Sequence, residues 1–104
     1  MSPVVCLTTV ASVREAKRIA LHLVKKRLAA GINILPVLES GYHWKGRICR
    51  ERELLLIMKT TRPVSARLKR ELMKIHPYDL PEFVVLPILH GSAPYLRWIR
   101  SNVR

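Results

Sequence analysis

The chain has 104 residues, a length typical of one domain rather than two, so we expect a single domain over residues 1–104. A hydrophobic content of 49% and a charged content of 25% are ordinary for a soluble globular protein, and the absence of internal repeats excludes a solenoid. Nineteen Lys and Arg against seven Asp and Glu give a formal charge of +12. Such a charge suggests nucleic acids, acidic membranes or acidic ligands as binding partners. The alternative is an ordinary solvated surface, because the charges are spread along the chain rather than clustered.

Hydropathy and cysteine usage bear on membrane association and on the cellular compartment of the protein. No apolar run approaches the ~20 residues of a membrane-spanning helix, and the N-terminal run is too short for a signal peptide, so we expect no membrane partner. Cys6 and Cys49 form neither a CxxC pair nor a zinc-finger spacing. Cys6 lies in an apolar run and is expected to be buried, while a disulfide between the two remains open. This usage predicts a cytoplasmic protein.

The first two elements are a strand and a helix. Val4–Thr9 is short, apolar and rich in β-branched residues, which predicts a buried strand. Ser12-Val13-Arg14-Glu15 matches the S-x-x-E capping box at a helix start. Gly31, which tolerates a positive φ, is expected to end that helix. Apolar residues recur at helical spacing between these two signals, namely Ala16, Ile19, Ala20 and Leu23.

A long hairpin follows. Ile32–Glu39 reads as a strand in which Pro36 implies an edge position or a bulge. Gly41–Trp44 continues as extended chain, and Lys45-Gly46 is a plausible hairpin turn. Ile48–Thr60 is the return strand.

The return strand carries the fully apolar stretch Leu54–Met58. Such a run predicts burial on both faces, either at the centre of a sheet or at an oligomer interface. Both arms are long against a usual strand length of ~5–6 residues. We therefore expect the hairpin to lean on a neighbouring subunit.

The second half repeats the helix and strand order. Pro63 lies in the first turn of a second helix, which Pro77 ends. Phe83–Leu89 is a fourth strand, with Pro87 again implying an edge or a bulge, and Pro94 opens a short helix to about Asn102. The order β-α-β-β-α-β plus a terminal helix predicts an α+β, ferredoxin-like sandwich with two helices on one face of the sheet.

The segment His76-Pro77-Tyr78-Asp79-Leu80-Pro81-Glu82 is the strongest functional candidate. Its two prolines predict a stiff, ordered turn that presents an imidazole, a phenol and two carboxylates. His76 is a candidate metal ligand, with Glu53 and Glu82 as oxygen ligands. The alternatives are a capping or hydrogen-bonding role for His76 and an ion pair between Glu53 and Lys59 or an arginine.

The aromatic and the basic residues are two further candidate groups. The aromatic residues Tyr42, Trp44, Tyr78 and Trp98 suit either pocket walls or plain packing. Basic residues line both predicted helices, which would let their outer sides merge into one patch, but no nucleic-acid-binding motif is present and we expect no nucleic-acid partner. Phosphate-binding loops and hydrolase motifs are also missing, so we expect no enzymatic activity, with an enzyme built on His76 and Glu53 as the alternative.

Several stretches follow one another at a characteristic spacing: Arg27-Leu28-Ala29-Ala30-Gly31-Ile32-Asn33, Ser40-Gly41-Tyr42-His43-Trp44-Lys45-Gly46, Glu53, Lys59-Thr60, His76 to Glu82 and Tyr95-Leu96-Arg97-Trp98. In this order they resemble the CutA family of divalent-cation tolerance proteins. The resemblance runs from about Val4 to Trp98. It implies a homotrimer whose long hairpins bridge subunits, with copper-type metal binding at His76. It also implies clefts between subunits, lined by Tyr42, Trp44, Glu53, Lys59, His76, Tyr78 and Glu82, and we assign Trp98 to the same clefts.

The chain departs from the family pattern at three positions. Ile75 stands where some members carry a second histidine, Thr8 where some carry a strand cysteine, and Gly31 where a cysteine is common. Each departure removes a ligand type that copper prefers. By analogy with trimeric PII signalling proteins, the alternative function is a regulatory trimer that senses a small anionic ligand in its clefts.

Overall fold

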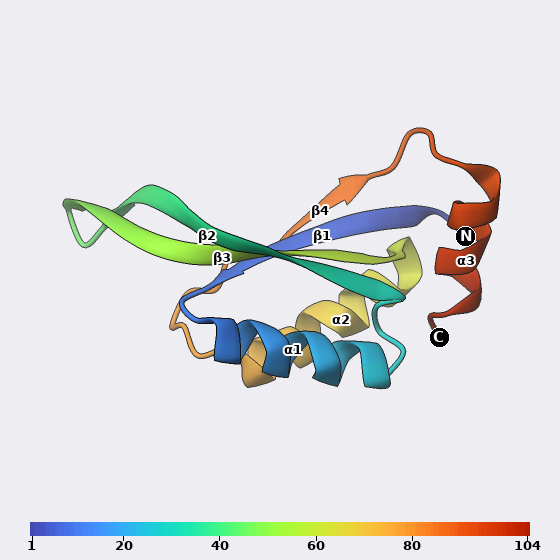
Figure 1. Cartoon of the computed structure of the whole chain (residues 1–104), viewed down its shortest axis with the longest axis horizontal. Coiled ribbons are helices and arrows are strands. Elements are labelled where there is room, and N and C mark those ends of the chain that lie inside the picture. The colour runs from blue at the N-terminus through green and yellow to red at the C-terminus, as the bar shows by residue number, and fades with distance from the viewer.

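A computed structural model describes all 104 residues. The elements in chain order are β1 (Pro3–Val10), α1 (Val13–Lys25), β2 (Gly31–Trp44), β3 (Arg47–Thr61), α2 (Arg62–Ile75), β4 (Val84–Pro87) and α3 (Ala93–Ser101). The strands form one antiparallel sheet in the order β2-β3-β1-β4. Figure 1 shows α1 and α2 side by side under this sheet and the β2–β3 hairpin reaching beyond them. The predicted α+β, ferredoxin-like order with a long hairpin is confirmed.

The core lies between the sheet and the two helices. Residues at alternate positions of a strand face the same side, and the fully buried positions of β1 and β3 follow that period. They pack against the apolar stripes of α1 and α2, in a cluster that includes Cys6, Leu56, Met58, Ile19 and Leu68. Burial raises the pKa of the Cys6 thiol to about 11. Both cysteines are free, so the disulfide that the sequence left open does not form within the chain.

Helix α1 begins and ends on local signals. Ser12 is its N-cap, and the Ser12 hydroxyl accepts a hydrogen bond from the Glu15 backbone N–H at 3.2 Å. The prediction that Gly31 ends this helix was wrong. The helix stops at Lys25, and Arg27 takes the positive φ of 61°. Gly31 instead begins β2, where a Cβ atom would lie 3.1 Å from the Trp98 ring.

The hairpin agrees closely with its sequence signals. The register shift of β2 against β3 falls between Leu35 and Leu38 and so includes Pro36. At the turn, Lys45 and Gly46 both have positive φ, 50° and 74°, which matches the twist of the flanking strands. Strand β4 is shorter than the predicted Phe83–Leu89, and it is an edge strand paired only with β1.

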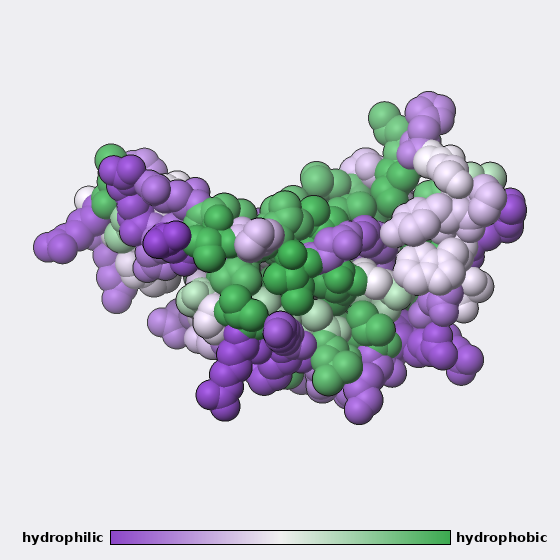
Figure 2. Space-filling model, in the orientation of Figure 1, coloured by the Kyte–Doolittle hydropathy of each residue, from purple (hydrophilic) through white to green (hydrophobic).

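The sheet face opposite α1 and α2 is apolar. By cross-strand register this face carries residues from all four strands, and we call it the apolar sheet face: Val5, Leu7, Leu35, Leu55, Ile57, Val84 and Leu86. All are at least partly exposed, in contrast to the fully buried residues on the helix side. In Figure 2 apolar residues gather over the middle of the strands, while the hairpin tip is hydrophilic. The longest helix has 14 residues, and no helix is both long and apolar enough to cross a membrane.

Candidate functional site

A hollow of about 800 Å³ lies between the outer half of the hairpin and the loop after α2. Its walls come from the hairpin (residues 40–44 with Cys49, Glu51 and Glu53) and from residues 78–84, with Thr9 at its inner end. The hairpin supplies one wall because its arms continue past the body of the sheet. The loop supplies the other: Pro77 and Pro81 fix their own φ angles, and the backbone bends at residues 78–80 between them.

The charge of this hollow is opposite to that of the chain. Four of the seven acidic residues line it, namely Glu51, Glu53, Asp79 and Glu82, and its lining contains no Lys or Arg. On a chain of charge +12, such a concentration of carboxylates gives a local negative potential inside a concave surface, where the field is focused. We call this region the acidic hollow.

His76 holds the loop to the sheet with both ring nitrogens. Its Nε2 lies 2.9 Å from the Thr9 carbonyl oxygen, which can only accept, so Nε2 carries the hydrogen. Its Nδ1 accepts the Tyr78 backbone N–H at 3.1 Å. The residue is 8% exposed, and burial lowers the pKa of the imidazole, which favours the neutral ring that these bonds require. In this fold His76 can bind a metal only by giving up one of the two hydrogen bonds.

Glu53 is held by a phenol rather than by a cation. The Tyr78 hydroxyl donates to Glu53 Oε2 at 2.6 Å, and the Tyr78 ring lies edge-on to the His76 ring at 4.7 Å. Burial, reinforced by the Glu53 carboxylate, raises the pKa of Tyr78 well above its usual range. The predicted ion pair between Glu53 and Lys59 or an arginine was wrong, because no basic group lies within 4.0 Å of this buried carboxylate.

The predicted metal set does not meet at one point. No group of three or more His, Cys, Asp or Glu side chains is placed to hold a single metal ion. Glu82 is exposed on the rim of the acidic hollow, Glu53 is buried at the Tyr78 hydroxyl, and His76 faces Thr9. The residues of one chain therefore do not fit an enclosed metal site, although the carboxylates of the hollow suit divalent cations as separate oxygen ligands.

The predicted cleft residues separate into two groups. Tyr42, Trp44 and Tyr78 line the acidic hollow. Lys59 lies at the other end of β3, opposite Gly31, and the Trp98 ring lies beside that same glycine. Lys59 and Glu53 are six residues apart on one strand, so they share a sheet face about 20 Å from each other.

Part of the lining of the acidic hollow was not predicted from the sequence. Glu51 and Cys49 were not counted among the site residues, and neither was His43. The signal that could have found them is the hairpin register, because a two-residue turn at Lys45-Gly46 places Cys49 opposite Tyr42 and Glu51 opposite Ser40.

Comparison with known proteins shows which protein family this chain resembles. The profile of the family described as "CutA1 divalent ion tolerance protein" matches residues 4–102. A protein named "Divalent-cation tolerance protein CutA" from Thermus thermophilus is 47% identical over 98 residues, which are 94% of this chain and 95% of that protein. Human "Protein CutA" is 40% identical over 88 residues, which are 85% of this chain but only 49% of the human protein.

Solved structures agree in fold. The crystal structure of CutA1 from Oryza sativa superposes with a TM-score of 0.96 at 36% identity, over 100% of this chain and 95% of that one. The Thermus thermophilus structure gives a TM-score of 0.95 at 45% identity, over 98% and 99%. With a family match across nearly the whole chain and the same fold in its relatives, this protein belongs to the CutA1 divalent ion tolerance family.

Proposed function

We propose that this chain works without catalysis, as a homotrimer that binds divalent cations at the acidic hollow. The observation that carries the proposal is the gathering of four of seven carboxylates in one hollow that lacks Lys and Arg. The names of its relatives, which refer to divalent-cation tolerance, support the same class of ligand. The hollow favours this function over the sensing of a small anion there, because carboxylates repel anions.

The ligands that we assign are carboxylate oxygens of Glu51, Glu53 and Glu82, while His76 positions the loop. Oxygen ligands suit hard or intermediate cations, and Cys49 and His43 in the same lining add the donor types that copper prefers. Since one chain supplies no three donors close enough to share an ion, donors from a second subunit are expected to complete the coordination.

The apolar sheet face supports self-association. Glu53 and Val84 line the acidic hollow and also lie on this sheet face, so a second copy seated there adjoins the hollow. Lys59 lies on the same face at the far end of β3. In a cyclic, head-to-tail trimer the Lys59 end of one subunit approaches the acidic end of the next, which pairs opposite charges and closes the ring.

Cation binding is tested by calorimetric titration of Mn²⁺ and of Cu²⁺ into the full chain. We expect saturable binding that weakens about tenfold or more in the double variant Glu51→Gln, Glu82→Gln. The matched control is Glu39→Gln, since Glu39 lies on the same hairpin but pairs with Arg50 at 2.7 Å outside the hollow. Equal weakening in both variants, or no saturable binding by the parent chain, would show that the hollow is not the site.

Assembly is tested separately by sedimentation. We expect the parent chain to sediment as a trimer and Leu7→Glu or Leu55→Glu, on the apolar sheet face, to give smaller species. Leu21→Glu is the control, because Leu21 is 62% exposed on α1 on the other side of the molecule. A monomeric parent chain would contradict the trimer while leaving cation binding to its own test.

A further inference from the structure

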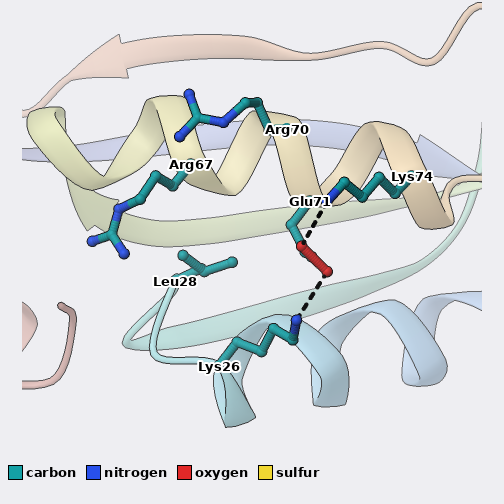
Figure 3. Close-up of a pocket in the computed structure, with 6 residues that line it drawn as sticks. All are labelled: Lys26, Leu28, Arg67, Arg70, Glu71 and Lys74. Carbon is teal, nitrogen blue, oxygen red and sulfur yellow. Dashed lines mark hydrogen bonds and ion pairs between the residues drawn. The ribbon is translucent and has the colours of Figure 1, made fainter.

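A second hollow lies on the helix side of the molecule, between residues 67–74 of α2 and the segment that follows α1 (Figure 3). Its volume is about 290 Å³. The residues that line it define what we call the basic groove: Lys26, Leu28, Arg67, Arg70, Glu71 and Lys74. Leu28 is almost fully buried at its base, and every other lining residue is ionisable.

The charges of the basic groove are not balanced inside the protein. Glu71 is the only acid, and its carboxylate lies 3.2 Å from Lys26 Nζ and 4.0 Å from Lys74 Nζ. The same carboxylate lies 3.0 Å from His22 Nε2. Four basic side chains against one carboxylate leave an excess of three positive charges in the lining.

Arg67 and Arg70 are the uncompensated groups. Neither takes part in any salt bridge or side-chain hydrogen bond of the chain, whereas Arg18 and Arg50 each pair with a glutamate. Figure 3 shows Arg67 extending from α2 on the side of Leu28 away from the Lys26–Glu71–Lys74 bridge, and Arg70 projecting from the upper side of α2. The bridge therefore holds the Lys26 and Lys74 ammonium groups in place, while the Arg67 and Arg70 guanidinium groups have no partner within the chain and can bind a ligand.

This arrangement fits one chemical class of ligand. Guanidinium groups bind phosphate oxygens in pairs of parallel hydrogen bonds, and lysines add point charges. A volume near the lower end of the ligand-pocket range admits a compact anion rather than a polymer. We propose that the basic groove binds a small, multiply charged phosphate-bearing anion, with Arg67 and Arg70 as its principal contacts.

The proposal is independent of the cation site. Helices α1 and α2 cover the opposite side of the sheet from the apolar sheet face, so a trimer formed through that face leaves the groove open (Figure 1). The small anion that the alternative function places in the intersubunit clefts is therefore expected at the basic groove instead, because the acidic hollow repels anions and the basic groove attracts them.

The test is a calorimetric titration of inorganic pyrophosphate into the full chain at constant ionic strength. The groove variant is Arg67→Gln with Arg70→Gln. The matched control is Arg47→Gln with Arg52→Gln, which removes two exposed charges from the hairpin. We expect saturable binding by the parent chain, a loss of affinity of about tenfold or more in the groove variant, and a change of less than about twofold in the control.

Further arms identify the source of the phosphate and exclude general charge attraction. Phosphoserine tests a monoester, sulfate at the same ionic strength tests any dianion, and a single-stranded RNA oligonucleotide tests a polymer. Saturable binding of pyrophosphate or of phosphoserine that depends on Arg67 and Arg70 supports anion binding at the basic groove. The compound that binds more tightly shows which kind of phosphate the groove prefers. Equal losses in both variants, equal binding of sulfate, or binding of the RNA alone would overturn the proposal. Unchanged urea midpoints will show that the exposed substitutions leave the fold intact.

Discussion

Tyr78 donates its hydroxyl hydrogen to Glu53 Oε2 at 2.6 Å and thereby fastens the loop after α2 to the middle of β3. The bond crosses 25 residues of sequence and lies at the boundary between the core and the acidic hollow. It explains how a carboxylate that is only 5% exposed is stabilised without a Lys or Arg side chain beside it.

We expect Tyr78→Phe to lower the free energy of unfolding by about 1–3 kcal/mol, because the buried Glu53 carboxylate loses its donor. Urea denaturation measures the change. Tyr95→Phe is the control, since the Tyr95 hydroxyl makes no hydrogen bond within the chain and the residue is 45% exposed. Identical stability of the two variants would mean that Glu53 finds another partner.

His76 should make stability depend on pH near neutrality. Burial lowers its pKa in the folded chain, so the unfolded chain takes up a proton first as the pH falls below about 6.5. The contribution is fully present above that value and is lost as the pH falls toward the folded pKa. The charged groups that act on the ring are Glu15, Arg18 and Glu53, and the Tyr78 ring packs against it. The lowered pKa of Glu15 affects stability only below its ordinary value of 4.5.

The measurement is the urea midpoint between pH 7.5 and 5 for the parent chain and for His76→Gln. We expect the variant to lose about 1–3 kcal/mol at pH 7.5, because it breaks buried hydrogen bonds, and to show a flatter pH profile. Cation affinity should stay within about twofold of the parent value, since the carboxylates are the assigned ligands. Loss of cation binding at full stability would instead make His76 a direct ligand.

Thr8 offers a stabilising substitution. Its hydroxyl is buried in the core between Cys6 and Val10 and has no hydrogen-bond partner. Valine has nearly the same shape without the polar group, so we expect Thr8→Val to raise the free energy of unfolding by about 1 kcal/mol. Thr9→Val is the control, because the Thr9 hydroxyl is not buried without a partner. A loss of stability at position 8 would reveal a partner for that hydroxyl.

The hairpin turn should respond to substitution with opposite signs at its two residues. Gly46→Ala places a Cβ at a φ of 74°, which costs about 1 kcal/mol. Lys45→Asn puts a residue that tolerates positive φ at 50°, and should stabilise the turn by a few tenths of a kcal/mol. Hydrogen exchange of the β2–β3 amides near the turn measures both effects. Equal exchange in the two variants would contradict the strain argument.

Much of the fold could be predicted because its signals are local. The Ser12 cap, the prolines at positions 36 and 63, and the Lys45-Gly46 turn each act on the φ and ψ angles of their own neighbourhood. The end of α1 escaped prediction because an arginine, Arg27, takes the positive φ that a glycine usually supplies after a helix. Position 31 favours glycine for a different reason: a Cβ atom there would crowd the Trp98 ring, which only the tertiary structure brings close.

The sequence by itself determined the order of the elements, the apolar faces that make the core, and the loop that carries His76, Tyr78 and Glu82. Only the tertiary structure decided which groups these loop residues contact. The docking of the loop after α2 against β3 brought Asp79 and Glu82 to the hollow that Glu51 and Glu53 line, and the Thr9 carbonyl accepts a hydrogen bond from the His76 ring. The packing of α1 on α2 left Arg67 and Arg70 without acidic partners. These outcomes depend on contacts between residues far apart in the chain, which no local preference of φ, ψ or hydropathy encodes.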